Sequence, residues 1–95
     1  MDRRELEILV RQGEGSRLEF KRKVKHPEKI AREFVAFANT RGGTVLIGVG
    51  DDGTIYGSKD AKGEAYVLEQ WLDQNVSPTL PFTRAEIPIT STTTV

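Results

Sequence analysis

The chain has 95 residues, no cysteine, and 14 Lys and Arg against 14 Asp and Glu, so its formal net charge is zero. This length fits one small domain with a modest core, and the missing cysteines exclude disulfides and thiolate metal sites. No apolar run approaches the roughly 20 residues of a membrane-spanning helix, and the first residues lack a signal-peptide pattern, so we expect a cytoplasmic protein with no membrane partner.

The first part of the chain predicts a helix, a strand and a second helix. An amphipathic helix is expected over residues 2–12, with Asp2 placed to cap its first turn. Residues 17–22 then alternate between apolar and polar side chains, which indicates a half-buried strand. Pro27 suits the first position of a helix over residues 27–41, and the apolar side chains that follow make this the main core helix.

A central hairpin is the next expectation. Thr44 to Val49 is a nearly continuous apolar run, mainly of β-branched residues, which is typical of a buried strand. Asp52-Gly53 is a dipeptide favoured in tight hairpin turns, because both residues tolerate positive φ angles. Thr54 to Tyr56 would be the returning strand, so the hairpin covers about residues 44–57.

The last part of the chain predicts a third helix and one more strand. Apolar side chains recur at helical spacing over residues 63–75, and Pro78 and Pro81 prevent the helix from continuing. Residues 82–89 are a strand candidate, whose proline suits the edge of a sheet. The polar tail gives no stop signal, so we expect residues 1–95 to be a single domain at the N-terminal part of a longer protein.

The predicted fold class is therefore α+β: a small mixed or antiparallel sheet with a central hairpin, packed by three helices, with later strands missing. Large apolar side chains from the second helix, the central strand and the third helix should share one core. These are Phe34, Phe37, Leu46, Val49 and Trp71.

Charge is unevenly distributed along the chain. Residues 1–41 hold eleven Lys and Arg against seven Asp and Glu, whereas residues 42–95 hold three against seven. A cluster of basic side chains lies in and after the first strand, and a surface of this kind can bind phosphates by releasing condensed counterions. An ordinary solvated face is the alternative. The candidate nucleic-acid-binding residues are Arg17, Lys21, Arg22, Lys23, Lys25 and Lys29.

Carboxylates suggest a second site. Glu14 precedes the first strand, Glu19 and Lys21 share its polar face, and Asp51 and Asp52 lie at the hairpin tip. If the two strands are neighbours, these carboxylates could bind Mg²⁺ or Mn²⁺, which would activate water against a phosphodiester while the lysine stabilises developing charge. The alternative is a polar strand face beside a turn-forming Asp-Asp-Gly sequence.

Three segments together resemble a known family. Residues 13–21 (GEGSRLEFK), 36–49 (AFANTRGGTVLIGV) and 51–57 (DDGTIYG) closely resemble the Schlafen-type AlbA-like domain, also known as the divergent AAA domain. The resemblance covers about residues 3–89. It implies an α+β domain of prokaryotic transcriptional regulators and helicase-related proteins, with DNA or RNA as its partner.

The same resemblance implies an alternative activity. In Schlafen proteins two such lobes cut transfer and ribosomal RNA with two glutamates and an aspartate, which would correspond here to Glu14, Glu19 and either Asp51 or Asp52. This chain carries one lobe, and Gly15 separates Glu14 from Ser16 where the family often has Glu followed directly by Ser or Thr. A nucleic-acid-binding module is therefore the first hypothesis. A metal-dependent endoribonuclease lobe and a purely structural interaction domain are the alternatives, and homodimerisation stays open.

Overall fold

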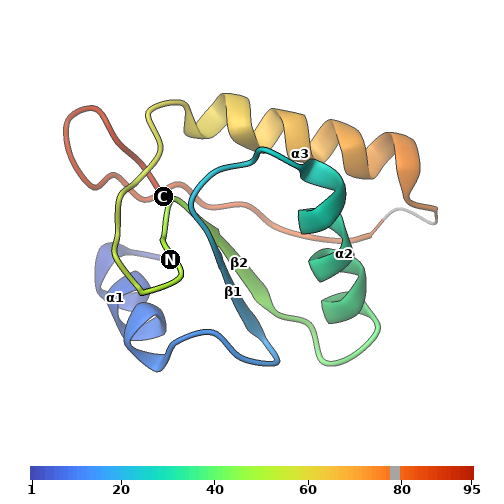
Figure 1. The fold of residues 1–95 in the computed structure, drawn as a ribbon, viewed down its shortest axis with the longest axis horizontal. Coiled ribbons are helices and arrows are strands. Elements are labelled where there is room, and N and C mark those ends of the chain that lie inside the picture. The colour runs from blue at the N-terminus through green and yellow to red at the C-terminus, as the bar shows by residue number, and fades with distance from the viewer. Residues whose placement is uncertain (78–79) are drawn as a thin grey trace.

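The computed structural model describes residues 1–77 and 80–95, and within them three helices surround two strands (Figure 1). The elements in chain order are α1 (Arg3–Gln12), β1 (Leu18–Lys21), α2 (Pro27–Ala38), β2 (Thr44–Ile47) and α3 (Ala61–Asn75). The α+β class is the predicted one. The predicted break at Pro78 lies outside the described residues.

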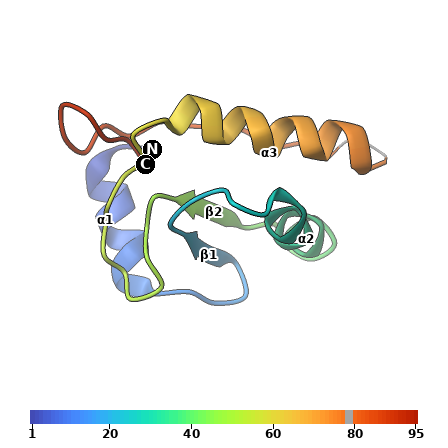
Figure 2. The ribbon, with the colours of Figure 1, turned by 45° about the horizontal axis from the view of Figure 1, so that its top comes forward.

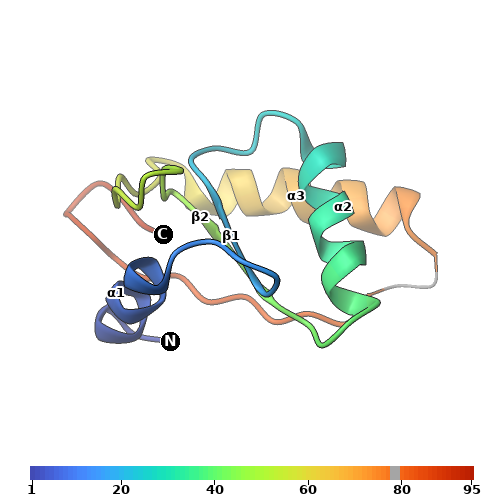
Figure 3. The same ribbon diagram turned by 60° about the horizontal axis from the view of Figure 1, so that its bottom comes forward.

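The two strands pair in parallel. Leu18 lies opposite Thr44 and Lys21 lies opposite Ile47, so the strands are in register over their whole length (Figure 3). Parallel neighbours need a long crossover connection, and α2 provides it between β1 and β2. The alternation predicted for β1 is confirmed, because Leu18 and Phe20 are buried.

The predicted antiparallel hairpin sheet is wrong. After β2 the chain bends at Gly48, whose φ of 104° lies outside the range of an extended strand. Tyr56 and Gly57 both donate their backbone N–H to the Gly48 carbonyl, and the only antiparallel bridge between the described residues of this segment is the one from Val49 to Ile55. Because one bridge does not make a ladder, the chain turns at Asp51 and Asp52, and Thr54 to Tyr56 return without becoming a strand.

The predicted strand at residues 82–89 is also absent from the described part of the chain. Its end makes an isolated bridge from Pro88 to Thr94, next to a pair of backbone hydrogen bonds between Ile87 and Val95. The proline has no N–H to donate to a longer ladder. The last residues therefore fold back on residues 87–89 instead of extending the sheet.

The helix ends follow from their caps. Asp2 accepts a hydrogen bond from the Glu5 N–H, as the sequence predicted for the start of α1. The end of α2 comes at Ala38, three residues before the predicted position, because the Gly42 N–H donates to the Phe37 carbonyl at 2.8 Å and Gly42 has a φ of 82°. Asp60 caps α3, which starts two residues before the predicted one.

The core consists of two clusters, not one. The first lies between α1 and one face of the sheet, and it contains Leu6, Leu18, Phe20, Leu46, Val49, Ile87 and Val95. The second joins α2 to α3 through Ile30, Ala31, Leu68 and Leu72, with the half-buried Phe34 and Trp71 against it. Figure 2 shows α1 on one side of the strands and α2 on the other. Since a strand sends alternate side chains to opposite faces, the two helices cannot share a single core.

Candidate functional site

A shallow groove of about 710 Å³ opens where β1 ends and α2 begins. Its basic side chains come from the end of β1, the following loop and the first turn of α2: Lys21, Arg22, Lys23, Lys25, His26 and Lys29. The lining also includes Asp51, Asp52 and Tyr56, from the segment after β2. We refer to this hollow as the basic groove.

Backbone hydrogen bonds hold the loop between β1 and α2, which forms part of the basic groove. The Val24 N–H donates to Glu64 Oε1 at 2.9 Å, which ties the loop to the first turn of α3. Pro27 then begins α2, and the His26 carbonyl accepts from the Lys29 N–H at 3.0 Å. The loop is therefore fixed by backbone contacts, which leave the side chains of Lys23 and Lys25 exposed to solvent.

Most of the groove cations are available to a ligand. Arg22, Lys23, Lys25 and Lys29 form no ion pair with any residue that the structure describes, and all four are exposed. Their charges are close in sequence and share one hollow, so they repel one another until an anion arrives. A polyanion would relieve this repulsion at several positions together.

Arg22 has an aromatic partner. Its guanidinium Cζ lies 3.9 Å from the centroid of the Tyr56 ring, within the range of a cation–π contact. Both side chains are exposed. The groove thus combines cations with a planar surface.

Lys21 differs from the other groove cations because carboxylates surround its ammonium group. Its Nζ lies 3.3 Å from Glu19 Oε1 and 3.7 Å from Glu33 Oε1, the latter on α2. Burial lowers the pKa of Lys21, but the two carboxylates outweigh it, so the pKa is raised overall. Lys21 is therefore a fixed cation of the folded chain more than a free phosphate ligand.

The pKa of Glu19 is raised, as is that of Lys21. Burial raises the pKa of Glu19 and the neighbouring Glu14 carboxyl raises it further, against the lowering effect of Lys21. Both partners of the pair thus have a raised pKa: burial and Glu14 raise that of Glu19, and Glu19 and Glu33 raise that of Lys21. Negative charge is in excess here, whereas the exposed part of the basic groove is positive.

The predicted site residues divide into two carboxylate sets. Glu14 and Glu19 lie side by side near Lys21. Asp51 and Asp52 line the basic groove, where Asp52 Oδ1 accepts the Thr54 N–H at 2.9 Å and this hydrogen bond lowers the pKa of Asp52. Among residues 1–77 and 80–95, no three acidic, His or Cys side chains form a group that could hold a metal ion. The described residues thus do not fit a shared Mg²⁺ or Mn²⁺.

Arg17 lies away from the other predicted binding residues. It precedes β1, and its guanidinium donates to the Arg41 carbonyl at 3.2 Å, beside the start of β2. The basic groove is at the other end of β1, beyond Lys21. The structure therefore brings five of the six predicted basic residues together and separates Arg17 from them.

Two residues of the site are missed by sequence reasoning. Glu33 reaches Lys21 from α2, and no local pattern distinguishes it from other polar residues of that helix. The sequence predicts Tyr56 only as part of a returning strand. Its separation from Arg22, more than thirty residues along the chain, hides the contact between them, although an exposed aromatic residue near cations is a useful signal.

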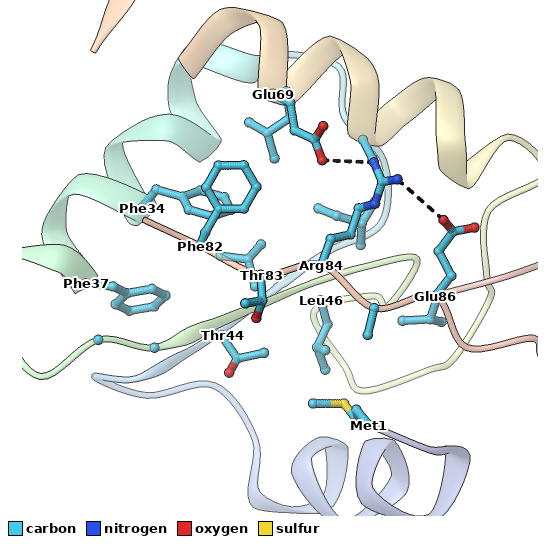
Figure 4. A pocket seen from close by; sticks show the side chains of 18 of the residues that line it. Met1, Phe34, Phe37, Thr44, Leu46, Glu69, Phe82, Thr83, Arg84 and Glu86 are labelled. Atoms are coloured by element: carbon cyan, nitrogen blue, oxygen red, sulfur yellow. Dashed lines mark hydrogen bonds and ion pairs between the residues drawn. The ribbon is translucent and has the colours of Figure 1, made fainter. Parts of the chain in front are cut away.

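A second hollow, of about 880 Å³, lies between β2, α2, α3 and residues 80–87 (Figure 4). Its lining is mainly apolar, and Phe34 meets Phe82 edge to face with 5.9 Å between ring centroids. Arg84 pairs with Glu69 at 2.9 Å and with Glu86 at 3.7 Å, and Glu5 also lines the hollow, so carboxylates outnumber the arginine there. This hollow therefore lacks the excess positive charge of the basic groove.

No helix in the described ranges combines the length and the apolar character needed to cross a bilayer. A protein-family model described as "Schlafen, AlbA_2" matches residues 14–95. The matched range begins at Glu14, after α1, and includes both strands and the entire basic groove. No curated protein and no solved structure matches the chain.

Proposed function

This chain belongs to the Schlafen AlbA_2 family, and from that premise we propose that it is a nucleic-acid-binding module whose basic groove holds the phosphate backbone. The family supports a role related to nucleic acid. We place the module in a prokaryotic transcriptional regulator or helicase-related protein. Its ligand is DNA or RNA, and binding requires no cofactor.

One observation carries the proposal: four exposed cations share one groove without an ion-pair partner among the described residues. Arg22, Lys23, Lys25 and Lys29 come from a segment of eight residues and line one hollow, so several of them can contact the phosphates of one strand together. Asp51 and Asp52 repel phosphates from the other side of the groove and confine the backbone to the lysine side. Most of the binding free energy should come from phosphate contacts, which carry no sequence information themselves.

The test is a charge reversal that spares the folded framework. Lys23, Lys25 and Lys29 would be replaced together by Glu, leaving Lys21 with its carboxylates and Arg22 with Tyr56. Fluorescence anisotropy with a labelled oligonucleotide between about 50 and 200 mM salt gives the affinity and its salt dependence. We expect the variant to lose binding at the higher salt, and the slope of log K against log salt to fall by about 2 to 3.

A matched control separates local from overall charge. Replacement of Arg4, Arg41 and Lys59 by Glu makes the same change in net charge at exposed positions outside the groove lining. This control should keep most of the affinity and nearly the parental slope. If both triple variants lose affinity equally, binding depends on net charge alone; if neither loses any, the groove is an ordinary solvated surface. Either result would refute the proposal.

An endoribonuclease is the second candidate, favoured by the closeness of Glu14, Glu19 and Lys21. A raised pKa like that of Glu19 is typical of carboxyl groups that transfer protons in active sites, and structural ion-pair networks perturb pKa values as well. Labelled transfer RNA would be incubated with the parent chain and with Glu14→Gln and Glu19→Gln. Cleavage that only the parent performs would support this activity. Equal cleavage by all three would identify a contaminant, and no cleavage would leave a binding module alone.

A further inference from the structure

The Tyr56 ring against Arg22 is a feature that phosphate binding does not require. The guanidinium lies 3.9 Å from the ring centroid, and 41% of the Tyr56 surface is exposed. Both residues line the basic groove, beside the unpaired lysines. A simple electrostatic surface would need the charge of Arg22 but no aromatic ring.

The backbone that carries the Tyr56 ring is held in place. The Tyr56 N–H donates to the Gly48 carbonyl at 2.9 Å, next to the bridge from Val49 to Ile55. Gly50 gives the ring its space, because a Cβ at that position would lie only 2.9 Å from Tyr56 Cε2. Tyr56 is thus positioned before any ligand binds, which reduces the conformational entropy lost on binding.

A planar guanidinium on a tyrosine ring offers a surface on which a nucleobase can stack. Bases stack on aromatic rings and on arginine planes, and proteins that bind single strands combine such surfaces with a groove of cations. In a duplex the base faces are already covered by their neighbours, so the same surface has nothing to contact. A ring and guanidinium in the groove therefore favour unpaired nucleotides.

The charges of the basic groove give an orientation to such a strand. Lys23, Lys25 and Lys29 attract the phosphates toward the loop and α2. Asp51 and Asp52, on the same side as Tyr56, repel phosphates and can accept hydrogen bonds from the amino groups of a base. A strand lying in the groove would hence turn its bases toward Tyr56 and its backbone toward the lysines.

We propose that Arg22 and Tyr56 form a base-stacking site, and that the basic groove binds single-stranded nucleic acid in preference to duplex. This inference rests on the proposed nucleic-acid-binding function and adds the class of ligand. Stacking and phosphate contact use the sugar only weakly, so single-stranded DNA and RNA are both ligands by this chemistry.

The test compares four labelled oligonucleotides of one mixed sequence: single-stranded DNA, single-stranded RNA and the two corresponding duplexes. The parent chain should bind the single strands more tightly than the duplexes at equal salt. Tyr56→Ala should weaken single-strand binding by about 5- to 150-fold, the loss of one stacked base, and leave duplex binding within about twofold. Tyr56→Phe keeps the ring and should bind as the parent does.

Two further variants make the result specific. Arg22→Lys keeps the charge but removes the plane, and it should also lower single-strand affinity more than duplex affinity. Tyr66→Ala removes a ring that is 62% exposed on α3, outside the groove, and should change nothing. A thermal melt of each variant confirms that it is folded.

The outcomes separate the two proposals. If Tyr56→Ala lowers single-strand and duplex affinity equally, or lowers neither, the stacking site is refuted while the response to the triple lysine variant still decides whether the groove binds nucleic acid. If Arg22→Lys matches the parent on single strands, the guanidinium plane has no role and the proposed site is wrong. Tighter binding of the duplexes by the parent would also overturn the inference. A difference between the two single strands identifies which one is the better ligand.

Discussion

Glu14 Oε2 accepts a hydrogen bond from the backbone N–H of Phe20, with 3.0 Å between the two atoms. Next to it, the Gly15 N–H donates to the Leu18 carbonyl at 3.0 Å. These contacts occupy the edge of β1 that does not face β2, and they place the Glu14 carboxyl beside Glu19. A residue that the family resemblance places in catalysis thus has a structural role in this chain.

We expect Glu14→Ala to lower the free energy of unfolding by about 1 kcal/mol, because it leaves the Phe20 N–H without its acceptor. Glu14→Gln keeps an oxygen at that position and removes a charge next to Glu19, so it should be no less stable than the parent. Urea unfolding of the three proteins measures both values. Equal losses for Ala and Gln would show that the charge matters and the hydrogen bond does not.

The raised pKa of Glu19 should make the stability of the folded chain depend on pH. Burial and the Glu14 carboxyl raise the pKa of Glu19 in the folded state above its unfolded value. The contribution of protonated Glu19 to the stability of the folded state is therefore fully present below the unfolded pKa of about 4.3. It is lost as the pH rises through the folded pKa. Glu19→Gln resembles the protonated form, so its stability relative to the parent should increase between about pH 4 and about pH 7.

Urea unfolding at several pH values measures this difference. The control is Glu7→Gln, which changes an exposed carboxylate on α1. If the difference between parent and Glu19→Gln stays constant over this range, or increases toward low pH, then Lys21 and not burial controls the titration of Glu19.

The two-cluster core predicts unequal costs for two phenylalanines. Phe20 is 1% exposed within the first cluster, and its replacement by Ala should cost about 3 to 5 kcal/mol. Phe34 is only half-buried, and its edge-to-face contact with Phe82 is partly solvated, so Phe34→Ala should cost less, about 1 to 2 kcal/mol. Denaturation followed by Trp71 fluorescence compares them. A larger loss for Phe34 would mean that α2 dominates the core, as the sequence alone suggests.

Gly57 and Gly13 allow backbone strain to be separated from steric overlap. Both have positive φ, 73° and 79° respectively. A Cβ on Gly13 would meet nothing within 4 Å, whereas one on Gly57 would lie 2.8 Å from the Thr93 Cβ. Gly13→Ala should therefore cost only the conformational penalty, about 1 to 2 kcal/mol, and Gly57→Ala distinctly more. Similar melting temperatures for the two variants would indicate that the segment at Thr93 moves at little cost to make room for the new Cβ.

Local signals predict the elements well and their pairing poorly. The cap at Asp2 and the alternation of β1 depend on residues close in sequence, and both are confirmed. The Asp-Gly turn is also a local signal, but pairing depends on the whole backbone: the bend at Gly48 stops the ladder after one bridge. A helix between two strands indicates a parallel crossover, and the turn signal conceals that pattern.

The site shows the same limit. Four of the groove cations lie within eight residues, so their clustering is visible in the sequence. Tyr56 and Glu33 reach the site only through tertiary contacts, with Arg22 and Lys21 respectively. The charge of the groove is thus predictable, but its stacking surface and the excess of carboxylates around Lys21 are not.

Leu6 and Val95 are buried in the same cluster, and Arg3 donates a hydrogen bond to the Ile89 carbonyl at 3.1 Å. These contacts join residues more than eighty positions apart, so they form only after a long loop has closed, and such contacts slow folding. During synthesis, α2 and its loop can form while the first cluster is still open, because residues 87–95 have not yet left the ribosome. The newly made chain should therefore expose Phe20 and Leu46 until Val95 emerges. During this interval the chain is most prone to aggregate and to bind chaperones.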